Sequence, residues 1–151
     1  MEVMAKTSDS VTAIIIVDHG SRRQASNDML EQATRNFAAG SEYQVVEPAH
    51  MELAQPDIAT AFARCVQRGA TRVIVFPYFL SPGRHWNEDI PNLTKAAAAA
   101  YPDVDWLVTA PFGLHPGMSA IINDRIQHCL NVATSGEGSC DVCSGGQRCK
   151  L

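Results

Sequence analysis

The stretch SVTAIIIVDHGSRRQ, residues 10–24, holds an apolar run that stops abruptly at Asp18, His19 and Gly20. Three isoleucines and a valine without polar alternation are typical of a strand that is buried on both faces, as in a parallel sheet. The residues after the run also suit a turn that leads into a helix N-cap. The stretch therefore predicts a buried strand that delivers a histidine to its own end, next to a serine and two arginines.

Strand and helix patterns alternate along the rest of the chain. Apolar residues of the segment after the first strand recur every four positions, which indicates a helix with one apolar stripe, at Ala25, Met29, Ala33 and Phe37. Further strands are expected at 43–48, 72–76 and 106–109, helices over 24–40, 58–68, 89–100 and 116–130, and a loop at 77–88. The order βαβαβαβα predicts an α/β fold, a four-stranded parallel sheet with helices on both faces.

Composition and charge limit what such a chain can do. It has 151 residues, of which 46% are hydrophobic and 19% charged, and this is typical of a soluble domain with an adequate core. No apolar stretch approaches the roughly 20 residues that span a bilayer. The formal net charge of −4 argues against nucleic acid or an anionic membrane as the main partner. The N-terminus MEVMAKTSDS carries no signal or transit pattern, so the residues themselves indicate no compartment.

The end of the chain differs in composition from the rest. Residues 131–151 are rich in Gly, Ser and Cys and nearly devoid of large apolar side chains. Such a segment buries too little apolar surface to order itself without a metal or a partner. We therefore expect two parts, an α/β domain at 1–130 and a cysteine-rich tail at 131–151.

The five cysteines are unevenly distributed. An odd number concentrated near one end argues against a secreted disulfide framework and favours metal chemistry in a reducing compartment. From the spacing alone, structural zinc, an iron–sulfur cluster and thiol redox chemistry all remain open. Cys65 falls on a helical apolar stripe and is expected in the core. The cysteines available to a metal are Cys129, which could equally be a small buried apolar residue, and Cys140, Cys143 and Cys149.

Four of the five histidines follow shortly after predicted strands. Because the carboxyl ends of parallel strands meet at one edge of a sheet, we expect these side chains on a common rim. Glu52 and Glu88 fall in the same loops. The histidines of this rim are His19, His50, His85 and His115.

We favour His19, Glu52 and His85 as ligands of a metal ion, with plain solvent-facing loop positions as the alternative. Imidazole and carboxylate groups in a cleft suit Fe(II), Co(II), Ni(II) or Zn(II). The sequence has no contiguous zinc motif such as His-x-x-x-His, so a loosely held, exchangeable metal is expected. His115 precedes a proline at a helix start and is expected to cap that helix or to support the ligands. His50 is either a ligand or a packed loop residue.

Cationic and aromatic residues flank the same positions. The planar guanidinium groups of Arg22, Arg23 and Arg84 suit carboxylates or phosphates, with ordinary solvent exposure as the alternative. Phe76 is expected in the core. The other aromatic residues of these loops are candidates to line an apolar pocket, and they are Tyr78, Phe79, Trp86 and Phe112.

Four motifs in order give the chain a resemblance to a known family. The segments VDHGSRR, AHMELAQPDI, FPYFLSPGRHWNEDIPNL and APFGLHPGM resemble those of the short, single-domain class II chelatases, the sirohydrochlorin chelatases. The likeness covers roughly residues 10–130. It implies a homodimeric lyase that inserts Fe(II) into sirohydrochlorin as the last step of siroheme synthesis, a branch of tetrapyrrole (porphyrin) biosynthesis. Relatives insert cobalt toward cobalamin.

The resemblance also implies roles for individual residues. His19 and His85 match the family's paired metal-handling histidines, and Glu52 matches their acidic partner. Neutral imidazole can both bind Fe(II) and accept a pyrrole proton, which fits this role. Sirohydrochlorin carries many carboxylates, so the expected substrate-binding residues are Ser21, Arg22, Arg23, Arg84 and Trp86.

The tail segment SCDVCSGGQRCKL resembles that of the plant-type members of the family, which favours iron over cobalt. It implies a chloroplast protein with a [2Fe-2S] cluster on Cys129, Cys140, Cys143 and Cys149. A cobaltochelatase and a metal or tetrapyrrole carrier without turnover are the alternatives. A phosphate-binding domain is disfavoured, because the loop after the first strand lacks a glycine-rich cradle.

Overall fold

The computed structural model of the chain describes residues 9–138 and 142. The chain divides into two compact units, Met1–Gly113 and Leu114–Leu151, and each is described by itself. The first unit contains the sheet, and the second contains one long helix. No helix in the described part of the chain is both long and apolar enough to cross a membrane.

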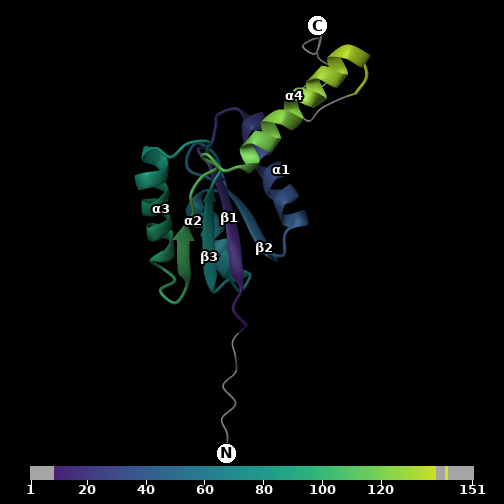
Figure 1. Cartoon of the computed structure of the whole chain (residues 1–151). Helices are drawn as coiled ribbons and strands as arrows, with labels where there is room; N and C mark the ends of the chain where they lie inside the picture. Colours follow the sequence, from purple (N-terminus) through teal and green to yellow (C-terminus); the bar gives the residue numbers. More distant parts are fainter. Residues whose placement is uncertain (1–8, 139–141, 143–151) are drawn as a thin grey trace, which may run out of the picture. The chain divides into compact units, whose positions relative to one another are not determined.

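The first unit is built on a four-stranded parallel sheet in the order β2-β1-β3-β4. The buried isoleucine run of β1 explains its central place, since both of its faces are covered. β1 pairs with β2 on one side and with β3 on the other, and the carboxyl ends of the strands lie at the upper end of the sheet in Figure 1. The strands are β1 (Thr12–Asp18), β2 (Val45–His50), β3 (Arg72–Pro77) and β4 (Asp105–Val108).

Helices cover both faces of the sheet, which confirms the predicted fold class. On one face, Leu30 of α1 (Gln24–Gly40) packs with Ile14 and Ile16 of β1. On the other face, Phe62 of α2 (Ile58–Gln67) and Ile90 of α3 (Ile90–Ala98) join a larger cluster with alternate residues of β1 and β3. Alternate residues of β1 thus belong to two cores, as expected for a strand buried on both sides.

The packed face of α1 differs from the predicted apolar stripe. Met29 and Phe37 are 58% and 41% exposed, whereas the helix buries Asn27, Leu30 and Thr34. The two buried polar side chains satisfy their own hydrogen bonds. The Thr34 hydroxyl donates to the Leu30 carbonyl, and the Asn27 amide bonds to the backbone of Ser21. Burying these polar groups therefore leaves no polar atom unpaired, and the helix packs with its less hydrophobic side.

Two element boundaries differ from the sequence expectation by more than two residues, and the second strand, expected at 43–48, is shifted so that His50 is its last residue. The expected loop at 77–88 ends in a single π-helical turn, η1 (His85–Asp89), whose i→i+5 bond runs from the Ile90 N–H to the His85 carbonyl. The last helix, α4 (Gly117–Ser135), continues past its expected end near residue 130, into the segment assigned to the tail. Gly136 ends it in the left-handed conformation, and the N–H of that glycine bonds to the Val132 carbonyl.

Cys65 lies in the core as expected. Its side chain is fully buried on α2 against the sheet, and desolvation raises the pKa of the thiol to about 12. The nearby negative charge on Glu47 contributes to this rise in the pKa. This cysteine is therefore a small apolar core residue rather than a reactive group.

Asp57 should make α2 sensitive to acid. Its carboxylate caps the helix by accepting the Thr60 N–H at 2.8 Å, and hydrogen bonds from Thr60 lower the pKa of Asp57 below its ordinary 3.8. The charged cap therefore contributes stability fully above that ordinary value and loses it as the pH falls through the lowered one. We expect Asp57→Ala to reduce the free energy of unfolding by about 1 kcal/mol at pH 7, measured by urea denaturation.

Asp57→Asn is the matched control for this prediction, because asparagine keeps the capping oxygen and cannot titrate. The difference in unfolding free energy between wild type and Asp57→Asn should shrink as the pH falls through the lowered pKa. A difference that stays constant down to strong acid would contradict the role assigned to the charge.

Candidate functional site at the carboxyl edge of the sheet

Three predicted residues meet where β1 and β2 end. His19 follows the last residue of β1, and Glu52 comes two residues after the end of β2. His19 Nε2 lies 3.0 Å from Glu52 Oε1. His85, the first residue of η1, packs its ring against that of His19 with the centroids 4.8 Å apart. The structure therefore brings His19, Glu52 and His85 together at one edge of the sheet.

Backbone hydrogen bonds fix the first two of these residues. The Met51 N–H donates to the Asp18 carbonyl at 2.8 Å, and the Glu52 N–H donates to the His19 carbonyl at 3.0 Å. Two backbone hydrogen bonds thus join the chain just past the ends of β1 and β2. Gly20 allows this close approach, because its φ is +88° and a Cβ there would lie only 1.8 Å from the Glu52 carbonyl oxygen.

The hydrogen bonds of His19 determine which of its nitrogens faces Glu52. Nδ1 lies 3.1 Å from the Gly20 carbonyl oxygen, which can only accept, so Nδ1 carries the proton. In the neutral ring, Nε2 then presents a lone pair to the Glu52 carboxylate. Two acceptor atoms in contact are stabilised by a cation that lies between them. This cation can be a proton. It can also be a metal ion, since two ligand atoms that each lie about 2.1 Å from a metal, at a right angle, are about 3.0 Å apart.

Asp89 orients the second histidine, and the sequence analysis missed it. His85 Nδ1 lies 2.7 Å from Asp89 Oδ2, so the ring donates there and its Nε2 is left available to a ligand. The available signal was the His-x-x-x-Asp spacing at the start of a helix, which places both side chains on one face. It was missed because this segment was expected to be a loop.

The three residues do not form a closed metal cage. Among the described residues, no group of three or more His, Cys, Asp or Glu side chains is arranged to hold a metal ion. The geometry is instead a His–carboxylate pair, His19 and Glu52, with the open Nε2 of His85 beside it. Such an arrangement leaves coordination positions of a metal free for exchange.

Hollows border His85 on two sides. One, of about 380 Å³, is lined by Met51, Glu52, His85, Asp89, Asn92 and Leu93. The other, of about 430 Å³, is lined by Tyr78, Phe79, Leu80, Ser81, Gly83, His85 and Trp86. Both lining sets include apolar side chains, so a flat, partly apolar ligand could lie against either side of the histidine.

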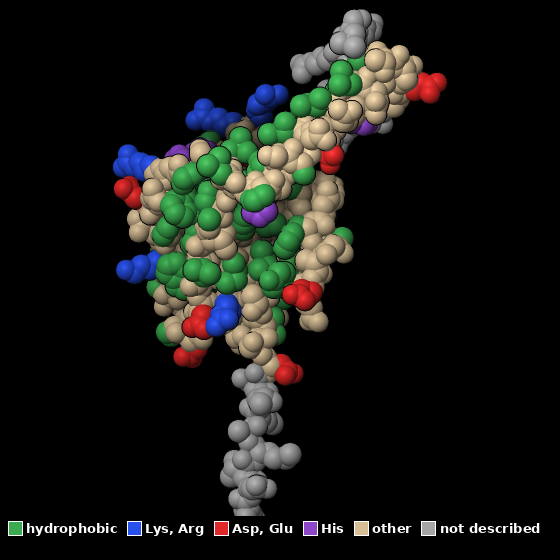
Figure 2. All heavy atoms as spheres, in the orientation of Figure 1, with side chains coloured by type: hydrophobic (Ala, Val, Ile, Leu, Met, Phe, Trp, Pro, Cys, Tyr) green, Lys and Arg blue, Asp and Glu red, His purple; other side chains and the backbone are tan. Residues whose placement is uncertain are grey.

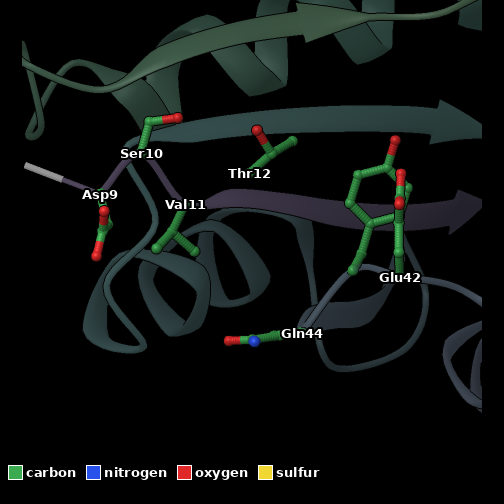
Figure 3. A pocket seen from close by; sticks show the side chains of 7 residues that line it. Asp9, Ser10, Val11, Thr12, Glu42 and Gln44 are labelled. Carbon is green, nitrogen blue, oxygen red and sulfur yellow. The ribbon is translucent and has the colours of Figure 1, made fainter.

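A further cavity, of about 530 Å³, lies at the opposite, amino end of the strands (Figure 3). The side chains around it include two carboxylates, from Asp9 and Glu42, and no histidine or cation. A hollow of this kind offers no imidazole to a metal and repels an anionic ligand. The carboxyl edge is therefore the better candidate.

The aromatic residues of the rim pack mainly on one another. Phe112 makes edge-to-face contacts with both Phe76 and Tyr78, at centroid distances of 5.1 and 4.8 Å. The Trp86 indole N–H donates to the Thr109 carbonyl at 2.8 Å, which ties η1 to the end of β4. Trp86 therefore has a structural bond in addition to its place in the wall of the hollow.

The three rim arginines differ in their surroundings. Arg84 is 82% exposed in its side chain and pairs with Glu88 at 3.3 Å. Arg22 and Arg23 are exposed and make no ion pair within the described part of the chain. Figure 2 shows basic side chains, in blue, along the upper margin of the α/β unit. Ser21 serves the turn, because its hydroxyl accepts the Arg23 N–H.

The remaining histidines of the expected rim have other surroundings. His50 is buried beneath the edge and hydrogen-bonded to Asp18. His115 lies in the second unit, where its Nδ1 accepts the Gly117 N–H at the start of α4, so the expected capping contact is present.

Only one of the four predicted cluster ligands lies among the residues that the structure describes. Cys129 is exposed on α4, so it is not the buried apolar residue that the sequence left as an alternative. Cys140, Cys143 and Cys149 lie outside the described residues.

Sequence comparisons find relatives of this chain. The family described as CbiX matches residues 13–129. The chloroplastic sirohydrochlorin ferrochelatase of Arabidopsis thaliana is 54% identical over 138 residues, covering 91% of this chain and 61% of that protein. The sirohydrochlorin ferrochelatase of Priestia megaterium is 30% identical, covering 82% and 46%. The chain thus spans less than two thirds of these relatives.

Solved structures give the same fold. The structure of SirB from Bacillus subtilis with Fe3+ matches with a TM-score of 0.71 and 29% identity, covering 80% of this chain and 46% of that one. A putative cobalamin biosynthesis CbiX protein from Marinobacter aquaeolei VT8 matches with a TM-score of 0.69 and 28% identity, covering 80% and 98%.

Gly20 should be far less replaceable than a glycine of similar backbone conformation elsewhere. Gly69 has a φ of +92°, and a Cβ at that position would have no other atom within 4 Å, so Gly69→Ala should cost only the left-handed conformation, about 1–2 kcal/mol. Gly20→Ala adds a clash with the Glu52 carbonyl and should cost about 1–3 kcal/mol more in unfolding free energy, measured by urea denaturation. Equal costs for the two variants would contradict the close approach described here.

Proposed function

Because the chain belongs to the CbiX family, we propose that it inserts Fe(II) into sirohydrochlorin and forms siroheme. The observation that carries the proposal is the pair of His19 Nε2 and Glu52 Oε1, 3.0 Å apart, with His85 in ring contact. Insertion requires groups that accept protons and bind a divalent metal in turn. Imidazole and carboxylate do both, and here they stand at the open edge of a rigid sheet.

The reaction needs two protons to leave as the metal enters. Two pyrrole N–H bonds break, four nitrogen–iron bonds form, and the protons pass to bases of the protein and then to water. His19 Nε2 and Glu52 face each other as acceptors and are suited to take a proton between them. His85 Nε2 is the second available base, because Asp89 holds the proton on Nδ1.

The same groups suit the delivery of Fe(II), the metal substrate. Imidazole is a good ligand of Fe(II), and a carboxylate adds the negative charge that offsets the cost of removing water from the ion. Because no three described side chains form a cage, an ion held by His19 and Glu52 would keep exchangeable positions for the macrocycle nitrogens. Tight enclosure by the protein would oppose transfer to the product.

Arg22 and Arg23 are the proposed partners of the substrate carboxylates. Both are exposed, and neither is engaged in an ion pair within the described residues, so their guanidinium groups can turn to an incoming anion. Arg84 would first have to exchange Glu88 for the substrate. The hollow beside Phe79 and Trp86 offers apolar surface for the rest of the macrocycle.

Iron is proposed rather than cobalt because the plant ferrochelatase shares 54% identity over most of this chain. Cobaltochelatases are also among the relatives, for example that of Methanopyrus kandleri at 24% identity. Fe(II) and Co(II) prefer similar ligands, so cobalt insertion is the second candidate function. A chloroplast location is part of the proposal, on the same plant relative.

A homodimer belongs to the same proposal. The chain covers 46% of both the Priestia ferrochelatase and the Bacillus SirB structure, so two copies together would match the length of either. We also propose a [2Fe-2S] cluster, bound by Cys129, Cys140, Cys143 and Cys149. The position of Cys129 at the surface of α4 is compatible with it, whereas Cys65 is buried in the core.

Multiple turnover is the decisive property. We expect the protein, kept anaerobic with sirohydrochlorin and excess Fe(II), to form many equivalents of siroheme, followed by absorbance. His19→Ala and His85→Ala should each lower kcat by about 100-fold or more, since each removes a positioned base. His115→Ala is the control and should stay within a few-fold of wild type. Binding of the macrocycle with no more than one insertion per chain would favour the carrier and overturn the proposal.

Substrate binding should depend on the two unpaired arginines. Replacing both in Arg22→Gln/Arg23→Gln should raise KM for sirohydrochlorin by about tenfold or more with little change in kcat, because charge-assisted hydrogen bonds contribute about 1.5–3 kcal/mol each. Arg72→Gln, at the amino end of β3 and paired there with Asp105, is the matched control and should leave KM unchanged. Equal increases in KM for the control and the rim variant would indicate that binding depends only on the net charge of the protein, and would contradict the role proposed for Arg22 and Arg23.

The nature of the tail site can be decided by analysis of the purified protein. A [2Fe-2S] cluster predicts equal amounts of iron and acid-labile sulfide, and Cys129→Ser or Cys140→Ser should lower both. Cys65→Ala, in the core, should leave both unchanged. Zinc without sulfide would instead identify a structural zinc site.

A further inference from the structure

His50 is a fully buried histidine that the proposed chemistry leaves without a task. It is the last residue of β2, and its side chain has no exposed surface. Nδ1 lies 2.7 Å from Asp18 Oδ1. Nε2 is buried and has no hydrogen-bond partner among the described residues; Glu31 Oε1 is 3.9 Å away, beyond bonding distance. Burial of an unpaired polar atom is costly, so an apolar residue of similar size would stabilise this position better.

Asp18 Oδ1 accepts two hydrogen bonds, one from His50 Nδ1 and one from the Gly20 N–H, the latter at 2.9 Å. Because both groups donate to this oxygen, His50 carries its proton on Nδ1 in this contact. Asp18 and Gly20 are the two chain neighbours of His19. One partly buried carboxylate, held by His50, thus ties down the backbone next to the histidine that faces Glu52.

The backbone places His50 directly beneath this bend. Asp18 and His50 are register partners in the pairing of β1 with β2, and a Cβ on Gly20 would lie 3.2 Å from the Cβ of His50. The imidazole therefore fills the space under the turn from which His19 projects. It also lies two residues before Glu52, so it acts on both members of the His19–Glu52 pair.

We infer that His50 is a positioning residue, which holds His19 and Glu52 in contact through its Nδ1–H bond to Asp18. It touches neither the metal nor the macrocycle. The inference rests on the proposed function in so far as it assigns the pair a part in metal insertion. The hydrogen bond from His50 Nδ1 to Asp18 positions the pair. A histidine that makes this bond also buries its Nε2, which has no partner among the described residues and therefore lowers stability.

Three substitutions separate the donor from the rest of the ring. In His50→Asn, the side-chain amide can donate from about the position of Nδ1. In His50→Gln, the amide reaches about the position of Nε2 instead, and in His50→Leu no donor remains. Glu31→Gln is the matched control, since it alters the carboxylate that lies near Nε2 without touching Asp18.

The primary readout is the affinity for Co(II) alone, without the macrocycle, because it does not depend on turnover. Only the Co(II) binding that is lost in His19→Ala is attributed to this site. Any Co(II) bound by cysteines is thereby excluded from the comparison. We expect His50→Gln and His50→Leu to weaken this affinity by about 10- to 100-fold, the range typical of residues that orient a ligand. His50→Asn and Glu31→Gln should stay within about threefold of wild type.

Turnover gives a second readout that separates positioning from general damage. In variants with a melting temperature near that of wild type, His50→Gln and His50→Leu should lower kcat about 10- to 100-fold and leave KM for sirohydrochlorin within about threefold. Folded Gln and Leu variants that bind Co(II) as tightly as wild type would overturn the inference. A loss in His50→Asn as large as that in His50→Leu would overturn it as well.

Failure of the inference and failure of the proposed function give different results. A wild-type protein that binds Co(II) through His19 but makes no siroheme would overturn the function, and the affinities of the variants would still judge His50. A wild-type protein without such a Co(II) site overturns the inference. If the Gln and Leu variants do not fold, Asp18→Asn, which keeps the shape and weakens the acceptor, has to lower Co(II) affinity by the same range; an unchanged affinity contradicts the inference.

Discussion

The backbone hydrogen bonds just past the ends of β1 and β2 are the constraint on which the candidate site depends. Two of them, from Met51 to Asp18 and from Glu52 to His19, join what would otherwise be two separate loops. A side chain at the end of a strand is normally placed by a mobile connection. Here the main chain of His19 and Glu52 is held by hydrogen bonds between the ends of two core strands, so both side chains start from fixed positions.

This rigidity has a chemical meaning. Two acceptor atoms held 3.0 Å apart repel each other unless a cation lies between them, and a flexible site would relax by moving one of them away. The backbone hydrogen bonds hold the main chain of both residues together, so only their side chains are free to move apart. A proton or a metal ion can each lie between the two acceptors, and these are the two species that the proposed metal insertion exchanges.

The fold and the meeting of the site residues could be predicted, for one physical reason. An unbroken apolar run of strand length, with helices alternating between such runs, predicts a buried parallel sheet, and a parallel sheet brings the ends of its strands to one edge. The packed face of α1 could not be predicted, because Asn27 and Thr34 pair their polar groups locally and become acceptable core residues. The contact of Asp89 with His85 was not predicted either, because its His-x-x-x-Asp spacing has meaning only on a helical turn, and this segment is rich in loop-forming residues.

The π-helical turn η1 makes the position of His85 depend on the number of residues in that turn. A π turn holds one residue more than an α turn between the same hydrogen-bonded ends. Deleting a single residue from this segment would restore an ordinary α-helix and rotate everything before it by about 100° about the helix axis. His85 would then turn away from His19, while α3 and the core behind it would be unchanged. At this edge of the sheet, insertions and deletions are therefore as consequential as substitutions. A turn one residue shorter would leave the fold the same and change which side chains meet at the site.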